Sequence, residues 1–280
     1  IQFMSDIYLH SIHQHPVKSC APIELSRGWI DELGLSGDRR YMVADESGVF
    51  MTARKYPKLT QLMATPFDGG IILAAQGAPT LELHEADYLD DYRETEVWKQ
   101  LMQAQHCGVE AQQWVSAFLD IPCQLLFFGE KTERPIKDFT EQQVSFADGY
   151  PLLLTSTASL DWLQERCPDF IAMQQFRPNL VASGNLPFAE DDWQEIQIGE
   201  VRFTVHSPCE RCKLTTLPPH SIEFNPHQEP LRTMLKYRRA HEGGALFGQN
   251  LIAQNCGVIE AGMPIEVIKQ APADLIRDVE

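Results

Sequence analysis

The chain has 280 residues, a mass of 31.8 kDa and a formal net charge of −16, from 23 lysines and arginines and 39 aspartates and glutamates. Hydrophobic residues make up 44% and charged residues 22%, which excludes a wholly disordered chain, a collagen-like fibre and a coiled coil. A chain with this much negative charge repels phosphate backbones and anionic lipid. We therefore expect no nucleic-acid binding and no membrane attachment. Any anionic ligand must be held by a few local cations.

The seven cysteines are odd in number and irregularly spaced, which makes a poor disulfide framework. The sequence contains no recognisable signal peptide and no apolar run long enough to cross a membrane. We therefore expect free thiols and a location in the reducing cytoplasm.

The first half of the chain reads mostly as strands and turns. The short apolar runs Tyr41–Ala44 and Val49–Thr52 are joined by Asp45-Glu46-Ser47-Gly48, which predicts a hairpin. Ile71–Ala75 predicts a further buried strand. The first predicted helix is Val109–Leu119, because its apolar residues recur at helical spacing.

The charged loop Gly129–Asp138 is the candidate boundary between a first domain, residues 1–128, and a second domain, residues 129–280. After it, the apolar run Leu152–Leu154 predicts a strand. Thr155 or Ser156 can cap a following helix that carries Leu160, Leu163 and Cys167 on one face.

A two-residue turn, Gly199-Glu200, joins two alternating runs into a predicted hairpin, and Pro264–Ile268 predicts a last strand. Many hairpins with a few amphipathic helices indicate a β-rich α+β fold of two barrel-like domains rather than a doubly wound sheet.

The strongest local feature is Cys209-x-x-Cys212 at the end of a predicted strand. A structural zinc site would need further ligands such as His206 or His220, and no second pair of cysteines or histidines stands at short spacing. A thioredoxin-like pair should open a helix, yet two consecutive prolines follow shortly. Two incidental thiols, or one thiolate donated to a soft metal or metal cofactor, are the other interpretations, and spacing alone does not choose among the four.

Several cations stand between turn residues and apolar runs, where their side chains can be partly buried. They are Lys18, the pair Arg39 and Arg40, and Arg177. A phosphate or carboxylate ligand would explain such placement. The alternative is an ion pair with one of the chain's many acids.

Five segments, in order along the chain, together resemble one known family. They are His15-Pro16-Val17-Lys18-Ser19-Cys20, Gly37-Asp38-Arg39-Arg40, Phe176-Arg177-Pro178-Asn179, Ser207-Pro208-Cys209-Glu210-Arg211-Cys212-Lys213-Leu214-Thr215-Thr216 and Gly244-Ala245-Leu246-Phe247-Gly248-Gln249-Asn250. The last three resemble MOSC domains, the molybdenum-cofactor-sulfurase C-terminal fold, and the first two resemble the β-barrel domain that precedes it. The resemblance spans nearly the whole chain. Within this family, the chain is similar to the YcbX-like proteins and the mitochondrial amidoxime-reducing components.

The resemblance implies a molybdenum–molybdopterin cofactor, with Cys212 as both the protein ligand to molybdenum and the catalytic residue. It implies that six further residues hold the pterin and its phosphate: Lys18, Ser19, Arg40, Asp148, Arg177 and Asn179. The three cations among them are expected to converge on one pocket between the two domains. The chain departs from the mitochondrial pattern at Glu210, where a serine is found, and at Asn250, where a tyrosine is found.

By the same resemblance, the activity is the reduction of small N-hydroxylated substrates such as hydroxylamine-type purines and amidoximes. The N–O bond breaks, water leaves, and two electrons and two protons are consumed. The sequence has no flavin, nicotinamide or iron–sulfur fingerprint, so we expect a flavoprotein reductase or a ferredoxin to supply electrons. Bacterial relatives often carry a C-terminal ferredoxin domain, so a [2Fe–2S] cluster is expected on such a domain outside this chain or on a partner.

The alternative function is a molybdopterin or sulfur carrier without turnover, since the MOSC fold also occurs fused to cofactor sulfurases. The strand-and-turn N-terminal half argues against a pyridoxal-type sulfurase domain there. Turnover with an artificial reductant would separate the enzyme from the carrier.

Overall fold

The computed structural model describes residues 7–273, which form two compact units assembled from separate segments. Unit 1 takes residues up to 13, residues 24–36 and residues from 150 onward, and unit 2 takes residues 14–23 and 37–149. The sequence predicts two contiguous domains that meet between residues 128 and 129, whereas the two units are each built from separate segments. The domain boundary therefore stays a prediction.

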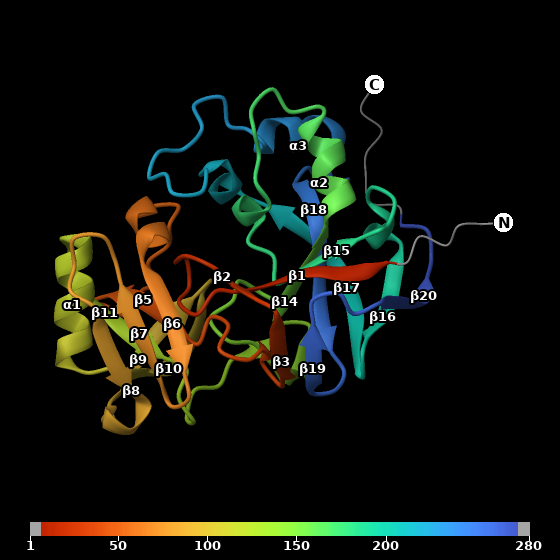
Figure 1. Ribbon diagram of the computed structural model, residues 1–280. Helices are drawn as coiled ribbons and strands as arrows, with labels where there is room; N and C mark the ends of the chain where they lie inside the picture. The colour runs from red at the N-terminus through yellow and green to blue at the C-terminus, as the bar shows by residue number, and fades with distance from the viewer. Residues whose placement is uncertain (1–6, 274–280) are drawn as a thin grey trace. The chain divides into compact units, whose positions relative to one another are not determined.

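Unit 1 is built on one eight-stranded sheet, which curls into an open half-barrel (Figure 1). Its strands lie in the order β2-β1-β15-β14-β18-β17-β16-β20. Their bounds are β1 (Tyr8–Gln14), β2 (Ile23–Leu25), β14 (Leu152–Ser156), β15 (Leu180–Ser183), β16 (Trp193–Ile198), β17 (Val201–Arg211), β18 (Ala245–Ala253) and β20 (Ile265–Gln270).

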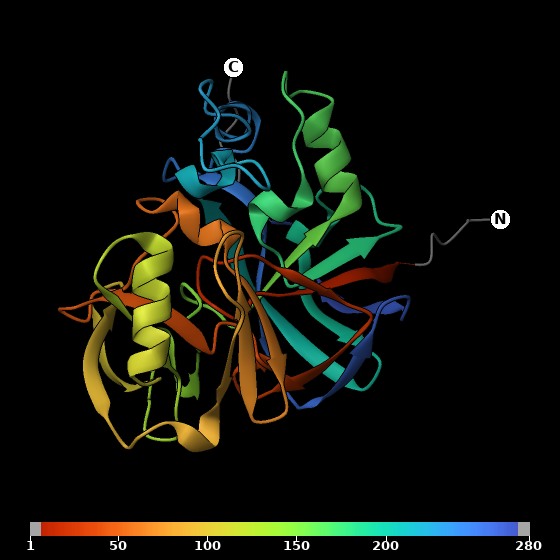
Figure 2. The same ribbon diagram turned by 60° about the vertical axis from the view of Figure 1, so that its left-hand side comes forward.

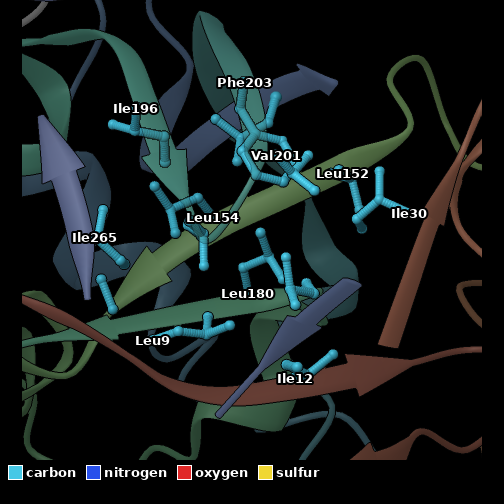
Figure 3. Packing of buried hydrophobic residues seen from close by; sticks show 14 of the residues in the cluster. Leu9, Ile12, Ile30, Leu152, Leu154, Leu180, Ile196, Val201, Phe203 and Ile265 are labelled. Carbon is cyan, nitrogen blue, oxygen red and sulfur yellow. The ribbon is translucent and has the colours of Figure 1, made fainter. Parts of the chain in front are cut away.

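The core of unit 1 lies on the concave side of this sheet, where side chains from neighbouring strands point toward one another (Figure 3). Leu9 of β1, Leu154 of β14, Leu180 of β15, Ile196 of β16 and Phe203 of β17 are fully buried there. Within β16, for example, Ile196 and Ile198 both belong to this core, because side chains two positions apart in a strand face the same side of a sheet. This burial fixes the register of the strands that carry the candidate site.

A second, three-stranded sheet completes the strands of unit 1. It has the order β19-β3-β4, with β3 at Arg27–Asp31, β4 at Gly34–Leu35 and β19 at Gly257–Glu260. The pairing of β3 with β19 joins two segments that lie far apart in the sequence.

Helices cover one end of the large sheet in unit 1. Because β14 and β15 run parallel, a crossover must connect them, and α2 (Thr157–Gln164) lies in that connection. The helix α3 (Leu231–Tyr237) packs beside β18, and short 3-10 helices are η3 (Met173–Phe176), η4 (Ala189–Asp191) and η5 (Lys213–Thr216). In Figure 1, α2 and α3 lie near each other, as the contact between Trp162 and Tyr237 requires.

Unit 2 consists of small antiparallel sheets. A four-stranded sheet has the order β5-β11-β10-β9, and the others are β6-β7-β8 and β12-β13. The bounds are β5 (Tyr41–Asp45), β6 (Met63–Phe67), β7 (Gly70–Ala74), β8 (Leu81–His84), β9 (Tyr92–Val97), β10 (Gln100–His106), β11 (Cys123–Phe127), β12 (Pro135–Ile136) and β13 (Phe139–Gln143), with η1 (Pro57–Gln61) and η2 (Glu85–Asp87).

The helix α1 (Val109–Leu119) packs on β11 and is seen in front of the strands of unit 2 in Figure 2. It buries Ala111, Val115 and Phe118 on the face that the sequence predicts. With three α-helices and twenty strands among the described residues, the fold is the β-rich α+β architecture that the sequence predicts.

Most predicted elements are confirmed, and two need correction. Residues 49–52 form no strand but only isolated bridges, Phe50 with Ala44 and Val49 with Glu96, although the turn at 45–48 is present. The helix α2 ends at Gln164, so Cys167 lies beyond it, although it packs in the same cluster as Leu163. The physical reason is Pro168, because a proline disfavours the helical conformation of the residue before it.

In the part of the chain that the structure describes, no helix combines the length and apolar character needed to cross a membrane. All seven cysteines lie in this part and are free thiols.

Candidate functional site

The candidate metal ligand Cys212 lies directly after β17 and is exposed. It precedes η5, and its carbonyl accepts hydrogen bonds from the Thr215 amide at 3.1 Å and from the Thr215 hydroxyl at 2.9 Å. The pairing of β17 with β18 is irregular between Pro208 and Glu210, because proline has no N–H to donate to the ladder. Cys212 therefore follows the end of a strand whose pairing is interrupted shortly before it, and its side chain is exposed.

The two thiols of the Cys-x-x-Cys motif have different surroundings. Cys209 is half-buried, and its sulfur accepts a hydrogen bond from Nη1 of Arg211 at 2.8 Å. The same guanidinium donates from Nη2 to the carbonyl of Phe176 at 2.6 Å. The sulfur of Cys209 is thus engaged within the protein, whereas Cys212 is presented to solvent.

Three of the motifs singled out in the sequence meet in unit 1. The Arg211–Phe176 hydrogen bond joins the cysteine motif to the segment that begins at Phe176. Gln175, just before that segment, donates from Nε2 to the Thr215 carbonyl of η5 at 2.8 Å. The ring of Phe176 also stacks on that of Phe247, with centroids 4.1 Å apart. Phe247 belongs to the motif that ends at Asn250, so this motif contacts the segment of Phe176 as well.

Arg177 ends η3 in the left-handed region, with φ of 54°. For a side chain with a Cβ this conformation is uncommon, and such strain is often found at functional positions. The strain is held in place by the neighbouring stacked Phe176, which is fully buried.

Asn179 is almost completely buried and holds three segments of unit 1 together. Its Oδ1 accepts from the Leu153 amide at 3.1 Å, and its Nδ2 donates to the His13 carbonyl at 3.2 Å. Its own amide donates to the carbonyl of Leu153 at 2.9 Å. These bonds give Asn179 a role in the sheet, and its predicted contact with a cofactor stays a prediction.

The described residues do not offer a set of side-chain ligands that could hold a metal ion without a cofactor. Among residues 7–273 there is no group of three or more histidines, cysteines, aspartates and glutamates that could hold a metal ion. His206, one candidate partner of the cysteines, is instead 2.9 Å from the hydroxyl of Tyr150 through its Nε2. A metal at Cys212 would have to take most of its ligands from a cofactor, which disfavours the structural zinc interpretation.

In unit 2, Lys18 and Asp148 form a direct ion pair, with Nζ 2.5 Å from Oδ1. Lys18 is buried and also donates to the Phe146 carbonyl at 2.7 Å. Burial lowers the pKa of Lys18 to about 8, although Asp148 opposes that shift. Partial desolvation by its neighbours opposes ionisation of the otherwise exposed Asp148 carboxyl, but the Lys18 ammonium and the Trp98 indole N–H outweigh it and hold the pKa of Asp148 well below its usual range.

Arg134 organises the segment that carries Asp148, and no pattern in the sequence indicates this role. It is 2% exposed, and it donates to three carbonyls, those of Ser145 at 2.6 Å, Ala147 at 2.5 Å and Asp148 at 2.9 Å. Burial lowers the pKa of Arg134 to about 10, so the guanidinium stays charged at neutral pH. These partners lie 11 to 14 residues away from Arg134 across an irregular loop, where no periodicity links them.

The remaining predicted residues, Ser19 and Arg40, also lie in unit 2. Ser19 follows Lys18 and is buried in the left-handed region, with φ of 69°. Arg40 is half-buried and close enough to Glu85 to favour ionisation of that carboxyl. Its neighbour Arg39 pairs with the buried Asp38 at 2.6 Å, so within this motif the ion-pair interpretation applies to Arg39.

The structure therefore joins the predicted residues in two groups. In unit 2 it pairs Lys18 with Asp148 directly, and in unit 1 it ties the segment of Arg177 to the segment of Cys212 through Arg211. The part that each residue plays toward a cofactor stays a prediction.

Comparison with known proteins agrees with this arrangement. The family model of the MOSC N-terminal beta barrel domain matches residues 6–122, and that of the MOSC domain matches residues 141–266. The fold, the meeting motifs and these matches define a protein that contains both MOSC domains, as the sequence motifs predict.

Mitochondrial amidoxime-reducing component 1 from Mus musculus is 32% identical over 275 residues, covering 91% of this chain and 81% of that protein. Mitochondrial amidoxime reducing component 2 from Bos taurus is 31% identical over 274 residues, covering 90% and 80%. The chain belongs to the MOSC family of the amidoxime-reducing components.

Two further comparisons, with a longer protein and with a solved structure, contribute less. Molybdenum cofactor sulfurase from Oryza sativa subsp. japonica is 31% identical over 269 residues, but these cover only 32% of that protein. A crystal structure of the YUAD protein from Bacillus subtilis aligns over 92% of this chain and 93% of that one, with 10% identity and a TM-score of 0.43. That likeness is too low to carry an argument.

Proposed function

We propose that this protein is a molybdenum-cofactor oxidoreductase that reduces small N-hydroxylated substrates, such as amidoximes and hydroxylamine-type purines. Its family relationship already supports a role connected with the molybdenum cofactor and with oxidoreduction. The observation that carries the proposal is the exposed thiol of Cys212 at the place where three MOSC motifs meet.

The donor set fits a pterin-bound molybdenum. Cys212 offers one accessible thiolate, and among residues 7–273 no further protein donors gather around a metal position. A soft thiolate suits a molybdenum centre whose other sulfur ligands come from a pterin dithiolene. When bound, the cofactor supplies the two-electron chemistry by which the N–O bond of the substrate breaks and its oxygen leaves as water.

The protein's own residues would bind and orient that cofactor. Lys18, Arg40 and Arg177 supply positive charge for its phosphate, which a chain of net charge −16 must concentrate locally. Asp148, held in place by Lys18 and Trp98, would accept hydrogen bonds from the cofactor on its exposed side. Ser19 and Asn179 complete the proposed set of pterin-binding residues.

Electrons for the reaction would come from a separate donor protein, a flavoprotein reductase or a ferredoxin with its [2Fe–2S] cluster. The sequence offers no flavin or nicotinamide fingerprint to take up electrons directly. The seven free thiols support a reducing compartment, and we propose the cytoplasm.

The test is turnover of an amidoxime by protein with a measured molybdenum and pterin content, supplied with reduced methyl viologen. We expect one amidine per two electrons consumed, and no turnover with NADH or NADPH alone. Absence of turnover in molybdenum-loaded protein would overturn the proposal and favour a cofactor or sulfur carrier. That second candidate is supported by the similarity to molybdenum cofactor sulfurase.

A further inference from the structure

Positive charge is concentrated in one segment of this acidic chain. Residues 211–241 contain six lysines and arginines and two glutamates, a net charge of +4. The rest of the chain contains seventeen lysines and arginines and thirty-seven aspartates and glutamates, a net charge of −20. The segment begins two residues after Cys209 and contains Cys212, η5 and α3.

Three of these cations line a shallow groove beside α3, with a volume of about 640 Å³. Arg232 and Lys236 are exposed, Arg239 is half-buried, and His227 lies on the loop opposite them. No carboxylate is among the described residues that line the groove, and at its margin Asp169 lies 3.4 Å from the His227 ring. We call these four lining residues the basic groove.

Two further cations of the segment contribute less to this surface. Arg238 is buried and paired with Asp191 at 2.5 Å, and its charge is compensated inside the protein. Lys213 is exposed, directly after Cys212, and its ammonium lies 4.4 Å from the centre of the Phe224 ring. Lys213 thus adds exposed positive charge next to Cys212 in the same segment.

The groove is fixed to the element that follows Cys212. The helix α3 packs against η5. The Asn225 amide donates to the Thr216 carbonyl of η5 at 2.7 Å, and the loop residues of the groove begin directly after Asn225. The groove and the thiol of Cys212 are thus held by one short, hydrogen-bonded stretch of unit 1.

We propose that the basic groove is the docking site of an acidic one-electron carrier protein that delivers electrons to the centre at Cys212. This inference rests on the proposed function, because only a reductase needs such a donor. Each N–OH reduction consumes two electrons, so two reduced carriers must dock and leave in succession during one turnover. A small, charged, shallow surface suits such brief encounters, which depend on electrostatic steering more than on buried area.

Charge also selects the partner. An acidic carrier is repelled by most of this chain and attracted by the basic groove, so it should arrive in one orientation. That orientation places its redox group near the segment that holds Cys212.

The experiment compares two charge-reversal variants of the molybdenum-loaded protein. Arg232→Glu with Lys236→Glu changes two exposed residues of the basic groove. Arg202→Glu with Lys269→Glu makes the same change in net charge at exposed positions elsewhere in unit 1. Each variant is assayed with an acidic [2Fe–2S] ferredoxin kept reduced, and separately with reduced methyl viologen, which needs no docking.

For the groove variant we expect kcat/KM for ferredoxin to fall at least tenfold and the methyl viologen rate to stay unchanged. Raising the ionic strength from 0.05 to 0.5 M should slow the wild-type ferredoxin reaction and leave the groove variant little affected, because salt screens exposed charges. An equal loss in the control variant, or no loss in the groove variant, would overturn the inference.

Direct binding of ferredoxin, measured by calorimetry, separates the two proposals because it needs no turnover. If wild-type protein binds ferredoxin through the groove but shows no methyl viologen activity, the proposed function fails and the docking surface stands. If the groove variant instead loses only binding to vesicles of anionic lipid, the surface is a membrane contact and the inference is wrong.

Discussion

Lys18 and Asp148 form an ion pair in which the cation is buried and the carboxylate is exposed, with side-chain exposures of 6% and 73%. The protein thus bears the cost of burying an ammonium group while leaving its partner in water. Such an arrangement is expensive for stability and is explained more readily by a ligand that uses both groups.

Stability should therefore rise with pH in an unusual window. The pKa of Lys18 is lowered from 10.5 to about 8 by burial, so the unfolded chain retains a proton that the folded chain loses between these values. The buried charge of Lys18 destabilises the folded protein fully below pH 8, and this loss of stability disappears as the pH rises to 10.5. Between pH 7 and 9.5 the free energy of unfolding should gain up to about 2 kcal/mol from this group.

Urea denaturation at both pH values measures this gain. Lys18→Met should lack it, while the exposed Lys99→Met should behave like wild type. An equal gain in wild type and Lys18→Met would show that Lys18 does not titrate in this window.

The two thiols should respond unequally to substitution. Cys212→Ser should abolish turnover with methyl viologen and remove one sulfur from the molybdenum X-ray absorption spectrum. Cys209→Ser should be mild, because a serine oxygen can still accept the hydrogen bond from Arg211. If Cys209→Ser proves the more damaging, the ligand assignment is wrong.

Removal of the Arg177 guanidinium should lower cofactor content without unfolding the protein. A charge-assisted hydrogen bond contributes about 1.5–3 kcal/mol, so the cofactor should bind roughly 10- to 150-fold more weakly. Both Arg177→Ala and Arg177→Gly should show this loss of molybdenum per chain. The glycine variant should be about 1 kcal/mol more stable than the alanine variant, because φ of 54° strains any residue with a Cβ.

The surface variant Arg166→Ala controls for loss of a cation in unit 1. It should retain its full molybdenum content. Equal molybdenum in all four proteins would remove Arg177 from the proposed binding set.

Arg134 should be among the costliest positions to change in unit 2. Arg134→Met leaves three buried or half-buried carbonyls without their donor, which should destabilise the protein by about 3 kcal/mol or more. The more exposed Arg93, paired with Asp91, is the matched control, and Arg93→Met should cost less than about 1 kcal/mol. Urea midpoints measure both, and equal midpoints would contradict the role assigned to Arg134.

Local signals predicted most of the fold. The helix α1 follows from apolar residues at helical spacing, and the β16–β17 hairpin follows from alternation on either side of Gly199-Glu200. Both depend on residues close in sequence. Hydrophobic spacing predicts that α2 continues to Cys167, but the helix ends at Gln164, because Pro168 restricts the backbone of Cys167 and backbone sterics prevail over hydrophobic periodicity.

The candidate site could be predicted only through ordered motifs. Spacing alone left Cys209 and Cys212 with four interpretations, and their difference arises from Arg211, whose orientation depends on its bond to Phe176. Asn179 reaches a carbonyl 166 residues away, a contact that no local pattern encodes. Arg134 stayed unnoticed for the same reason, since its partners lie across an irregular loop.

The pairing of β3 with β19 has a consequence for how the protein is made. Arg27–Asp31 leaves the ribosome more than 200 residues before Gly257–Glu260, the strand against which it pairs. At about 5–20 residues per second, β3 waits roughly ten to forty seconds with an open edge. Because an unpaired edge invites pairing with other chains, the nascent protein should depend on chaperones during synthesis more than its modest size suggests.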